Sequence, residues 1–170
     1  AFVETVHERL AAKAGEASLS DLLLLLEREP ELRSINAHVK QKAIAAGTGG
    51  LALIRCDGGG GFGYGHVKRM VALARALRDR EGIGSVFALN GTADAAEPIR
   101  AAGFEAILID RARDAKMLGD IIAARKPDLF LCDLRDGIGA GDVEKLKHEV
   151  AITAVIDDGS DRRLAADVAY

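Results

Sequence analysis

Residues 54–77 (IRCDGGGGFGYGHVKRMVALARAL) constrain the fold more than any other part of the chain. They begin within an apolar run, residues 51–56, of the kind that forms a buried parallel strand. They end in apolar residues at helical spacing, Met70, Leu73, Ala74 and Leu77. Six glycines from Gly58 to Gly65 lie between, and glycine permits positive φ angles and close approach of a ligand to the backbone. The segment therefore predicts a strand, a glycine loop and a helix whose first amides form a natural anion site.

Gly58, Gly60 and Gly63 also match the spacing of a dinucleotide-binding loop. Such a site needs an acidic residue about 20 positions further along, at the end of the second strand, to bind the ribose hydroxyls. Asn90 stands there instead, and the helical pattern begins near Gly65 rather than within the glycines. The sequence therefore disfavours a nicotinamide or flavin site, and we expect no cofactor.

His66 stands where this helix is predicted to begin, close to the cations Lys68 and Arg69. The plain alternative is a surface histidine at a helix start. Here, however, backbone donors and two cations meet an imidazole that is able to accept a proton, at the mouth of a strand-to-helix turn. This combination is typical of a general base, and His66 is the candidate.

The chain from residue 51 onward alternates strand and helix patterns. Strands are predicted near 51–56, 85–90, 105–110, 128–133, 152–157 and 167–170, and helices near 65–81, 92–102, 113–125 and 140–149. This alternation predicts an α/β fold with a Rossmann-like parallel sheet that is covered on both faces. With a strand order of 3-2-1-4-5-6, the first and fourth strands are neighbours.

These two neighbouring strands end alike, with Cys56-Asp57 and Cys132-Asp133. We expect the two cysteines to lie near one another as buried, reduced thiols. We also expect both aspartates to reach the crevice beside His66. Each aspartate has a plainer interpretation, in which it accepts backbone hydrogen bonds within its own turn.

Two further pairs of charged residues follow the predicted fifth strand. Carboxylates at strand ends, such as Asp157 and Asp158, are able to bind magnesium. Carboxylates in loops more commonly cap turns, so no metal site is predicted. Arg162 and Arg163 are able to clamp a phosphate, although such residues more commonly pair with nearby carboxylates.

Three separated motifs resemble one protein family. Residues 54–77 resemble the opening of the nucleotide-sugar hydrolases of the pseudaminic acid pathway and of related spore coat polysaccharide proteins. Those proteins begin with a strand, an Arg, an Asp, a glycine-rich loop and Gly-His-Val-x-Arg. Residues 127–137 (PDLFLCDLRDG) and 154–170 (AVIDDGSDRRLAADVAY) resemble later segments in the same order. The resemblance covers about residues 51–170.

The resemblance implies one half of a two-domain glycosyltransferase-type fold and hydrolysis of a UDP-linked diacetamido-trideoxy sugar to UDP and free sugar. In that family the histidine that corresponds to His66 is the base for water. We accordingly expect catalytic roles for His66 and Asp57. Substrate-binding roles are expected for Gly61, Gly63, Tyr64, Gly65, Arg69 and Asp133. The N-acetylglucosaminyltransferases of peptidoglycan synthesis have a similar loop and histidine, so transfer of the sugar to an acceptor is the alternative.

A chain of 170 residues corresponds to one domain with an appendage. The second domain of the family, which holds most of the UDP, is therefore expected beyond residue 170. A chain that starts with Ala1 fits an excised piece. We expect this half alone to have little or no activity.

Residues 1–46 are predicted to form a separate helical extension, and residues 45–50 (AAGTGG) a linker. Helical patterns span residues 2–13, a second helix capped by Ser18 or Ser20, and a third that runs from Pro30 to about Lys42. The leucines at 22–26 cannot all face water, so the extension is expected to pack on the α/β domain or on a second copy of the chain.

Residues 18–42 (SLSDLLLLLEREPELRSINAHVKQK) resemble the C-terminal tail of cytidylyltransferase-like proteins that are encoded with, or fused to, spore coat polysaccharide genes. This resemblance implies a cytidylyltransferase core before the tail in a longer protein, and no nucleotidyl transfer by this chain. A non-catalytic module of such a fusion protein is a further alternative.

Composition disfavours two kinds of partner. Hydrophobic residues make up 49%, charged residues 29%, and the formal net charge is −3. Nucleic acid is not expected, because no basic face with interleaved aromatics is evident. No apolar run approaches the roughly 20 residues of a membrane span, and no signal peptide is evident. The expected location is the cytoplasm.

Overall fold

The computed structural model describes residues 2–10, 18–34, 49–135, 137–156 and 159–170. The chain divides into two units, residues 1–41 and 42–170, and each is described by itself. Within the described ranges, no helix has both the length and the apolar character needed to cross a membrane.

The first unit is helical in the part that the structure describes. It contains α1 (Phe2–Leu10), α2 (Leu19–Arg28) and the 3₁₀ helix η2 (Pro30–Ser34). Ser18 caps α2 in a capping box, since its side chain accepts from Asp21 N while the Asp21 carboxylate accepts from Ser18 N. The third helix predicted from Pro30 is a 3₁₀ turn up to Ser34, and its remainder lies outside the described residues.

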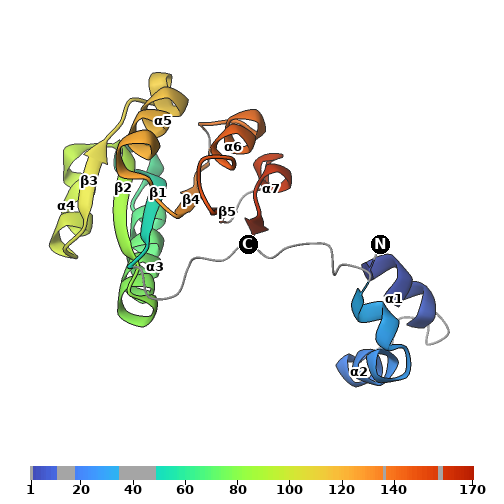
Figure 1. Ribbon diagram of the computed structural model, residues 1–170. Coiled ribbons are helices and arrows are strands. Elements are labelled where there is room, and N and C mark those ends of the chain that lie inside the picture. Colours follow the sequence, from blue (N-terminus) through green and yellow to red (C-terminus); the bar gives the residue numbers. More distant parts are fainter. Residues whose placement is uncertain (1, 11–17, 35–48, 136, 157–158) are drawn as a thin grey trace. The chain divides into compact units, whose positions relative to one another are not determined.

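The second unit is built on a six-stranded sheet in which all strand pairs are parallel (Figure 1). Its strands are β1 (Leu51–Gly58), β2 (Gly84–Gly91), β3 (Glu105–Leu108), β4 (Leu129–Asp133), β5 (Ile152–Val155) and β6 (Val168–Ala169). Their order is β3-β2-β1-β4-β5-β6. The predicted Rossmann-like α/β fold and strand order are therefore confirmed, and β1 lies between β2 and β4.

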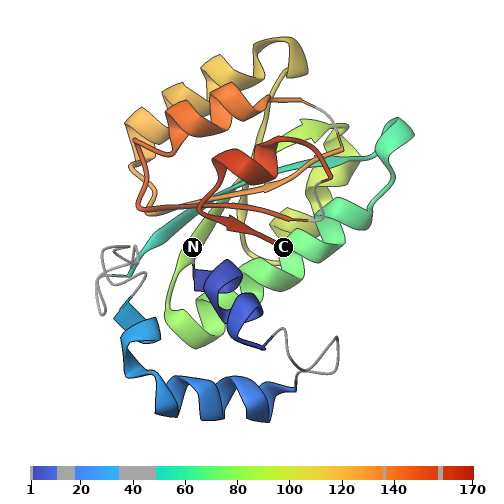
Figure 2. The ribbon, with the colours of Figure 1, turned by 90° about the vertical axis from the view of Figure 1, so that its right-hand side faces the viewer.

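Helices cover both faces of this sheet (Figure 2). The helices are α3 (Gly65–Glu81), α4 (Ala93–Ala101), α5 (Asp114–Arg125), α6 (Ala140–Leu146) and the short α7 (Arg162–Ala165), with 3₁₀ turns η3 (Gly60–Phe62) and η4 (Arg111–Arg113). One core cluster joins α3 and α4 to Ile54 and Phe87, whereas the other joins α5, α6 and α7 to Leu53 and Phe130. Burial on both faces explains why the central strands are apolar almost throughout.

The register between β1 and β4 decides which face each polar side chain reaches. Cys56 pairs with Asp133, and Arg55 pairs with Cys132. Because side chains alternate along a strand, Cys56 and Asp133 share the α3 face, while Arg55 and Cys132 share the α5 face. The two cysteines are thus on adjacent strands, as expected, but they pack into separate core clusters.

Candidate functional site

The first two glycines of the loop after β1 are required by packing. A Cβ on Gly58 would lie 2.5 Å from Val67 Cγ2, and one on Gly59 would lie 2.0 Å from Thr92 Oγ1. Gly59 also has a φ of +74°, a conformation that favours glycine. Its amide donates to Gly63 O at 2.8 Å and closes the turn. These residues hold the loop against α3 and α4.

The outer glycines leave the other side of the loop open. For Gly60, Gly61, Gly63 and Gly65, no heavy atom of the described residues lies within 4 Å of a Cβ position. Three of them are expected substrate-binding residues. The loop therefore exposes backbone that a ligand is able to approach.

Tyr64 fastens this loop to α4. Its hydroxyl donates to the carboxylate of Asp94 in the first turn of that helix. The hydrogen bond to Asp94 raises the pKa of Tyr64, and hydrogen bonds from Thr92 and Tyr64 lower the pKa of Asp94. Tyr64, expected to bind substrate, thus fixes the position of the loop at the start of α3.

His66 and Asp133 form a hydrogen-bonded pair at the carboxyl edge of the sheet. His66 Nδ1 lies 2.8 Å from Asp133 Oδ1. Arg69, one turn further along α3, donates from Nη2 to Oδ1 at 2.7 Å and from Nε to Oδ2 at 2.8 Å. The Asp133 side chain is only 1% exposed, whereas that of His66 is 17% exposed. The expectation that Asp133 reaches His66 is confirmed.

The guanidinium determines how this pair is protonated. A carboxylate that is bound bidentately by Arg69 is able only to accept hydrogen bonds. His66 Nδ1 must then carry the proton that it donates to Asp133, and the lone pair is left on Nε2. Nε2 has no partner within the described part of the chain. The arrangement is that of a base oriented by a buried carboxylate.

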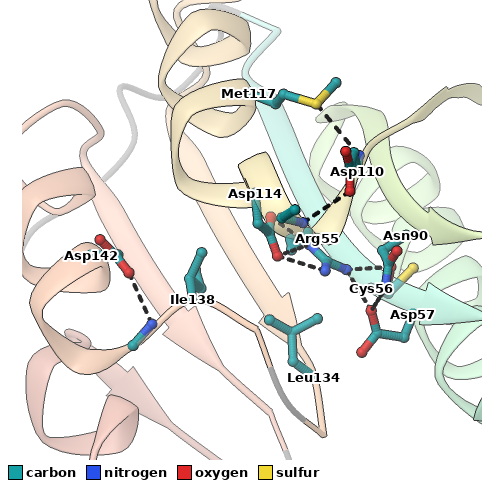
Figure 3. A network of polar contacts seen from close by, with 12 residues as sticks. Arg55, Cys56, Asp57, Asn90, Asp110, Asp114, Met117, Leu134, Ile138 and Asp142 are labelled. Atoms are coloured by element: carbon teal, nitrogen blue, oxygen red, sulfur yellow. Dashed lines mark hydrogen bonds and ion pairs between the residues drawn. The ribbon is translucent and has the colours of Figure 1, made fainter.

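Asp57 belongs to a different cluster, on the α5 face (Figure 3). It is fully buried, and its Oδ1 accepts from Arg55 Nη1 at 2.9 Å and from Asn90 Nδ2 at 3.1 Å. Its Oδ2 has no hydrogen-bond partner among the described residues. The expectation that both aspartates reach the crevice beside His66 therefore holds for Asp133 but not for Asp57. Asp57 forms its hydrogen bonds with Arg55 and Asn90, on the other face of the sheet.

Arg55 is the centre of that second cluster. Its guanidinium binds Asp114, the first residue of α5, from Nε to Oδ1 at 2.9 Å and from Nη2 to Oδ2 at 2.7 Å. Burial acts to lower the pKa of Arg55, but the carboxylates of Asp114 and Asp57 outweigh it and raise the pKa. Sequence reasoning missed this network. The one local signal in the sequence was an arginine within the otherwise apolar run at residues 51–56.

Among the remaining candidates of the sequence, Arg162 has a structural role, Arg163 is exposed, and the two aspartates lie outside the described residues. Arg162 is buried and donates to the carbonyls of Ile138 at 3.0 Å and Leu134 at 3.2 Å, so it fixes the loop after β4 rather than a phosphate. Asp157 and Asp158 lie outside the described residues. Within the described ranges, no group of three or more His, Cys, Asp or Glu side chains is placed to hold a metal ion.

No protein-family model matches the chain, and no curated protein matches it. The fold and the geometry together define a class, which is a Rossmann-like domain with a histidine–aspartate pair beside an open glycine loop.

Proposed function

We propose that this domain supplies the general base for hydrolysis of a nucleotide-linked sugar. The observation that carries the proposal is the pairing of His66 with Asp133 at 2.8 Å, next to a glycine loop whose outer side is open. The resemblance of residues 54–77 to the nucleotide-sugar hydrolases supports the same reaction. The substrate class we infer is a UDP-linked amino sugar.

The proposed step is attack of water on the anomeric carbon. The bond between that carbon and the phosphate oxygen breaks, UDP leaves, and His66 Nε2 takes a proton from the water. Asp133 stabilises the imidazolium that forms, and Arg69 holds Asp133 in position. Asp57 has no part in this proton transfer, because its hydrogen bonds lead to Arg55 and Asn90.

The nucleotide is assigned, in this proposal, to a second domain of a longer protein. The domain described here would shape the sugar side of the site, so alone it would turn over UDP-sugars poorly. A cytidylyltransferase core that precedes the helical extension, residues 1–46, and a location in the cytoplasm belong to the same proposal.

A glycosyltransferase is the second candidate, and one observation favours it. An apolar cavity of about 320 Å³ adjoins Arg69 and is lined by Met70, Leu73, Ile156 and Tyr170. Such a cavity is suited to the apolar part of an acceptor molecule. In that case an acceptor hydroxyl would replace water as the group that His66 deprotonates.

The test compares His66→Gln with His148→Gln in the protein that contains both domains. His148 is an exposed histidine whose ring lies 4.0 Å from Glu144, so its replacement is a matched control. We expect His66→Gln to lower turnover by about 10² to 10⁴ with an unchanged melting temperature, and the control to keep full turnover. Release of UDP without an acceptor identifies a hydrolase, and a requirement for an acceptor identifies a transferase. Full turnover in His66→Gln would contradict the assignment of the base and favour a non-catalytic module.

A further inference from the structure

A second cavity, of about 430 Å³, opens at the carboxyl edge of the sheet, on the face opposite His66. Residues 111–116, at the start of α5, form one wall, and Gly137, Ile138 and Asp142 form the other. Asp114, Ile138 and Asp142 are labelled in Figure 3. The volume falls within the range of small-molecule sites.

Three cations and two carboxylates line this cavity. Three of the nine lining residues, Arg111, Arg113 and Lys116, carry positive charge. Arg55 binds both oxygens of the buried Asp114 carboxylate, and it also binds the carboxylate of Asp57. Asp142 accepts a hydrogen bond from Gly139 N at 3.0 Å as part of a helix cap.

Two of these cations are in exposed ion pairs that a ligand is able to replace. Arg113 lies 3.6 Å from Asp110, and Lys116 lies 2.7 Å from Asp120. All four side chains are more than half exposed, and ion pairs of this kind contribute little to stability. Both cations are therefore available to an anion at low cost.

The opposite wall is held in place before any ligand binds. Arg162 donates to the carbonyls of Leu134 and Ile138 and so fixes the loop after β4. Gly137 has a φ of +141°, and a Cβ at this position would lie 3.1 Å from Asp114 Oδ2. A preformed wall reduces the entropy that binding must overcome.

We propose that this cavity binds a small phosphate ester the size of a sugar phosphate, independently of the His66 site. Guanidinium groups suit phosphate oxygens because they donate several hydrogen bonds in one plane. The cavity has room for a sugar ring beside the phosphate. The first residues of α5 line the cavity, so the positive end of the helix dipole also lies there.

The experiment is calorimetric titration of the 170-residue chain with glucose 1-phosphate, inorganic phosphate and glucose. We expect saturable one-to-one binding of glucose 1-phosphate, at least tenfold tighter than of inorganic phosphate, and none of glucose. Arg113→Gln combined with Lys116→Gln should weaken binding of the ester at least tenfold. Ala115→Trp, which fills the cavity without a change of charge, should weaken it equally.

Two control variants separate this site from general attraction and from the proposed catalytic site. Arg100, paired with Glu97 at 3.2 Å, is a matched exposed arginine, and Arg100→Gln should leave affinity within twofold. His66→Gln should also leave the affinity for glucose 1-phosphate within twofold. Failure of the catalytic proposal would therefore not affect the proposal for this cavity. The proposal is overturned by equal losses in Arg100→Gln and the double variant, by full affinity in Ala115→Trp, or by inorganic phosphate binding as tightly as the ester.

Discussion

The carboxylates of Asp57 and Asp133 point to opposite faces of one sheet, although they lie near the ends of adjacent strands. Asp133 is level with Cys56, one residue before Asp57, and neighbouring positions on a strand face opposite ways. Asp133 therefore meets His66 and Arg69 on the α3 face, while Asp57 meets Arg55 on the α5 face. The carboxyl edge thus carries two separate polar clusters with different surroundings.

Asp133 should control the tautomer of His66. Nitrogen-detected NMR of the 170-residue chain near pH 8 should show the proton of the neutral His66 ring on Nδ1, because that nitrogen donates to Asp133. Asp133→Asn should weaken this preference, and Asp79→Asn, at an exposed pair with Arg78, should not change it. A ring protonated mainly on Nε2 in the wild-type chain would contradict the orientation of the base.

Arg55 should be more important for stability than either of its carboxylate partners. Arg55→Met leaves two buried carboxylates without a cation and should cost about 3–5 kcal/mol. Asp114→Asn should cost less, about 1–3 kcal/mol, because Arg55 keeps Asp57 and Cys56 O as acceptors. Urea unfolding followed by circular dichroism measures both, and the reverse ranking would show that Asp57 does not hold the guanidinium.

The inner and outer glycines of the loop should respond differently to alanine. Gly59→Ala places a Cβ 2.0 Å from Thr92 Oγ1 at a φ of +74° and should destabilise by roughly 1–3 kcal/mol. Gly61→Ala meets no described atom within 4 Å, and its effect should stay within about 0.5 kcal/mol. Equal effects at the two positions, measured by urea unfolding, would show that the loop is not packed as described.

Cys56 should remain a thiol at pH values where an ordinary cysteine ionises. Burial raises its pKa from 9.0 to about 12, and Arg55 opposes the shift only in part. Between these values the unfolded chain loses the proton that the native chain keeps, so stability falls as the pH rises. The difference in unfolding free energy between wild type and Cys56→Ala should therefore shrink from pH 8 to pH 10. A constant difference would contradict the shift.

The sequence predicted the sheet well because its signals are local. Apolar runs at 51–56 and 128–133, separated by helical patterns, are enough to indicate parallel strands, and the order considered for them was the one common in doubly wound sheets. The pairing of His66 with Asp133 followed from that order, since the carboxyl ends of β1 and β4 meet at one edge. The position of Asp57 could not be predicted, because a register shift of one residue reverses every side chain.

The cavity beside α5 was also beyond sequence reasoning. Asp114 and Arg55 are 59 residues apart, and nothing near Asp114 in the sequence marks it as the partner of a buried cation. Arg162 could be interpreted as a phosphate clamp until the structure showed its guanidinium bound to backbone carbonyls. Long-range pairs of this kind depend on tertiary packing rather than on local pattern.

The α/β unit should fold without the helical extension. Two hydrogen bonds hold the beginning of its first strand. Gly50 O accepts from Gly84 N at 2.8 Å, and Leu51 N donates to the Asp128 carboxylate at 2.9 Å. Deletion of residues 1–45 keeps both bonds, whereas deletion of residues 1–51 removes both.

We therefore expect the shorter deletion to leave the unfolding free energy of the α/β unit within about 0.5 kcal/mol, and the longer one to cost about 1–3 kcal/mol. Leu23 and Leu24 are half exposed in the extension, so its removal should also change the oligomeric state or the solubility, measured by analytical ultracentrifugation. If the chain without residues 1–45 failed to fold, the helices would be an integral layer of the α/β domain, and the division of the chain into two units would be wrong.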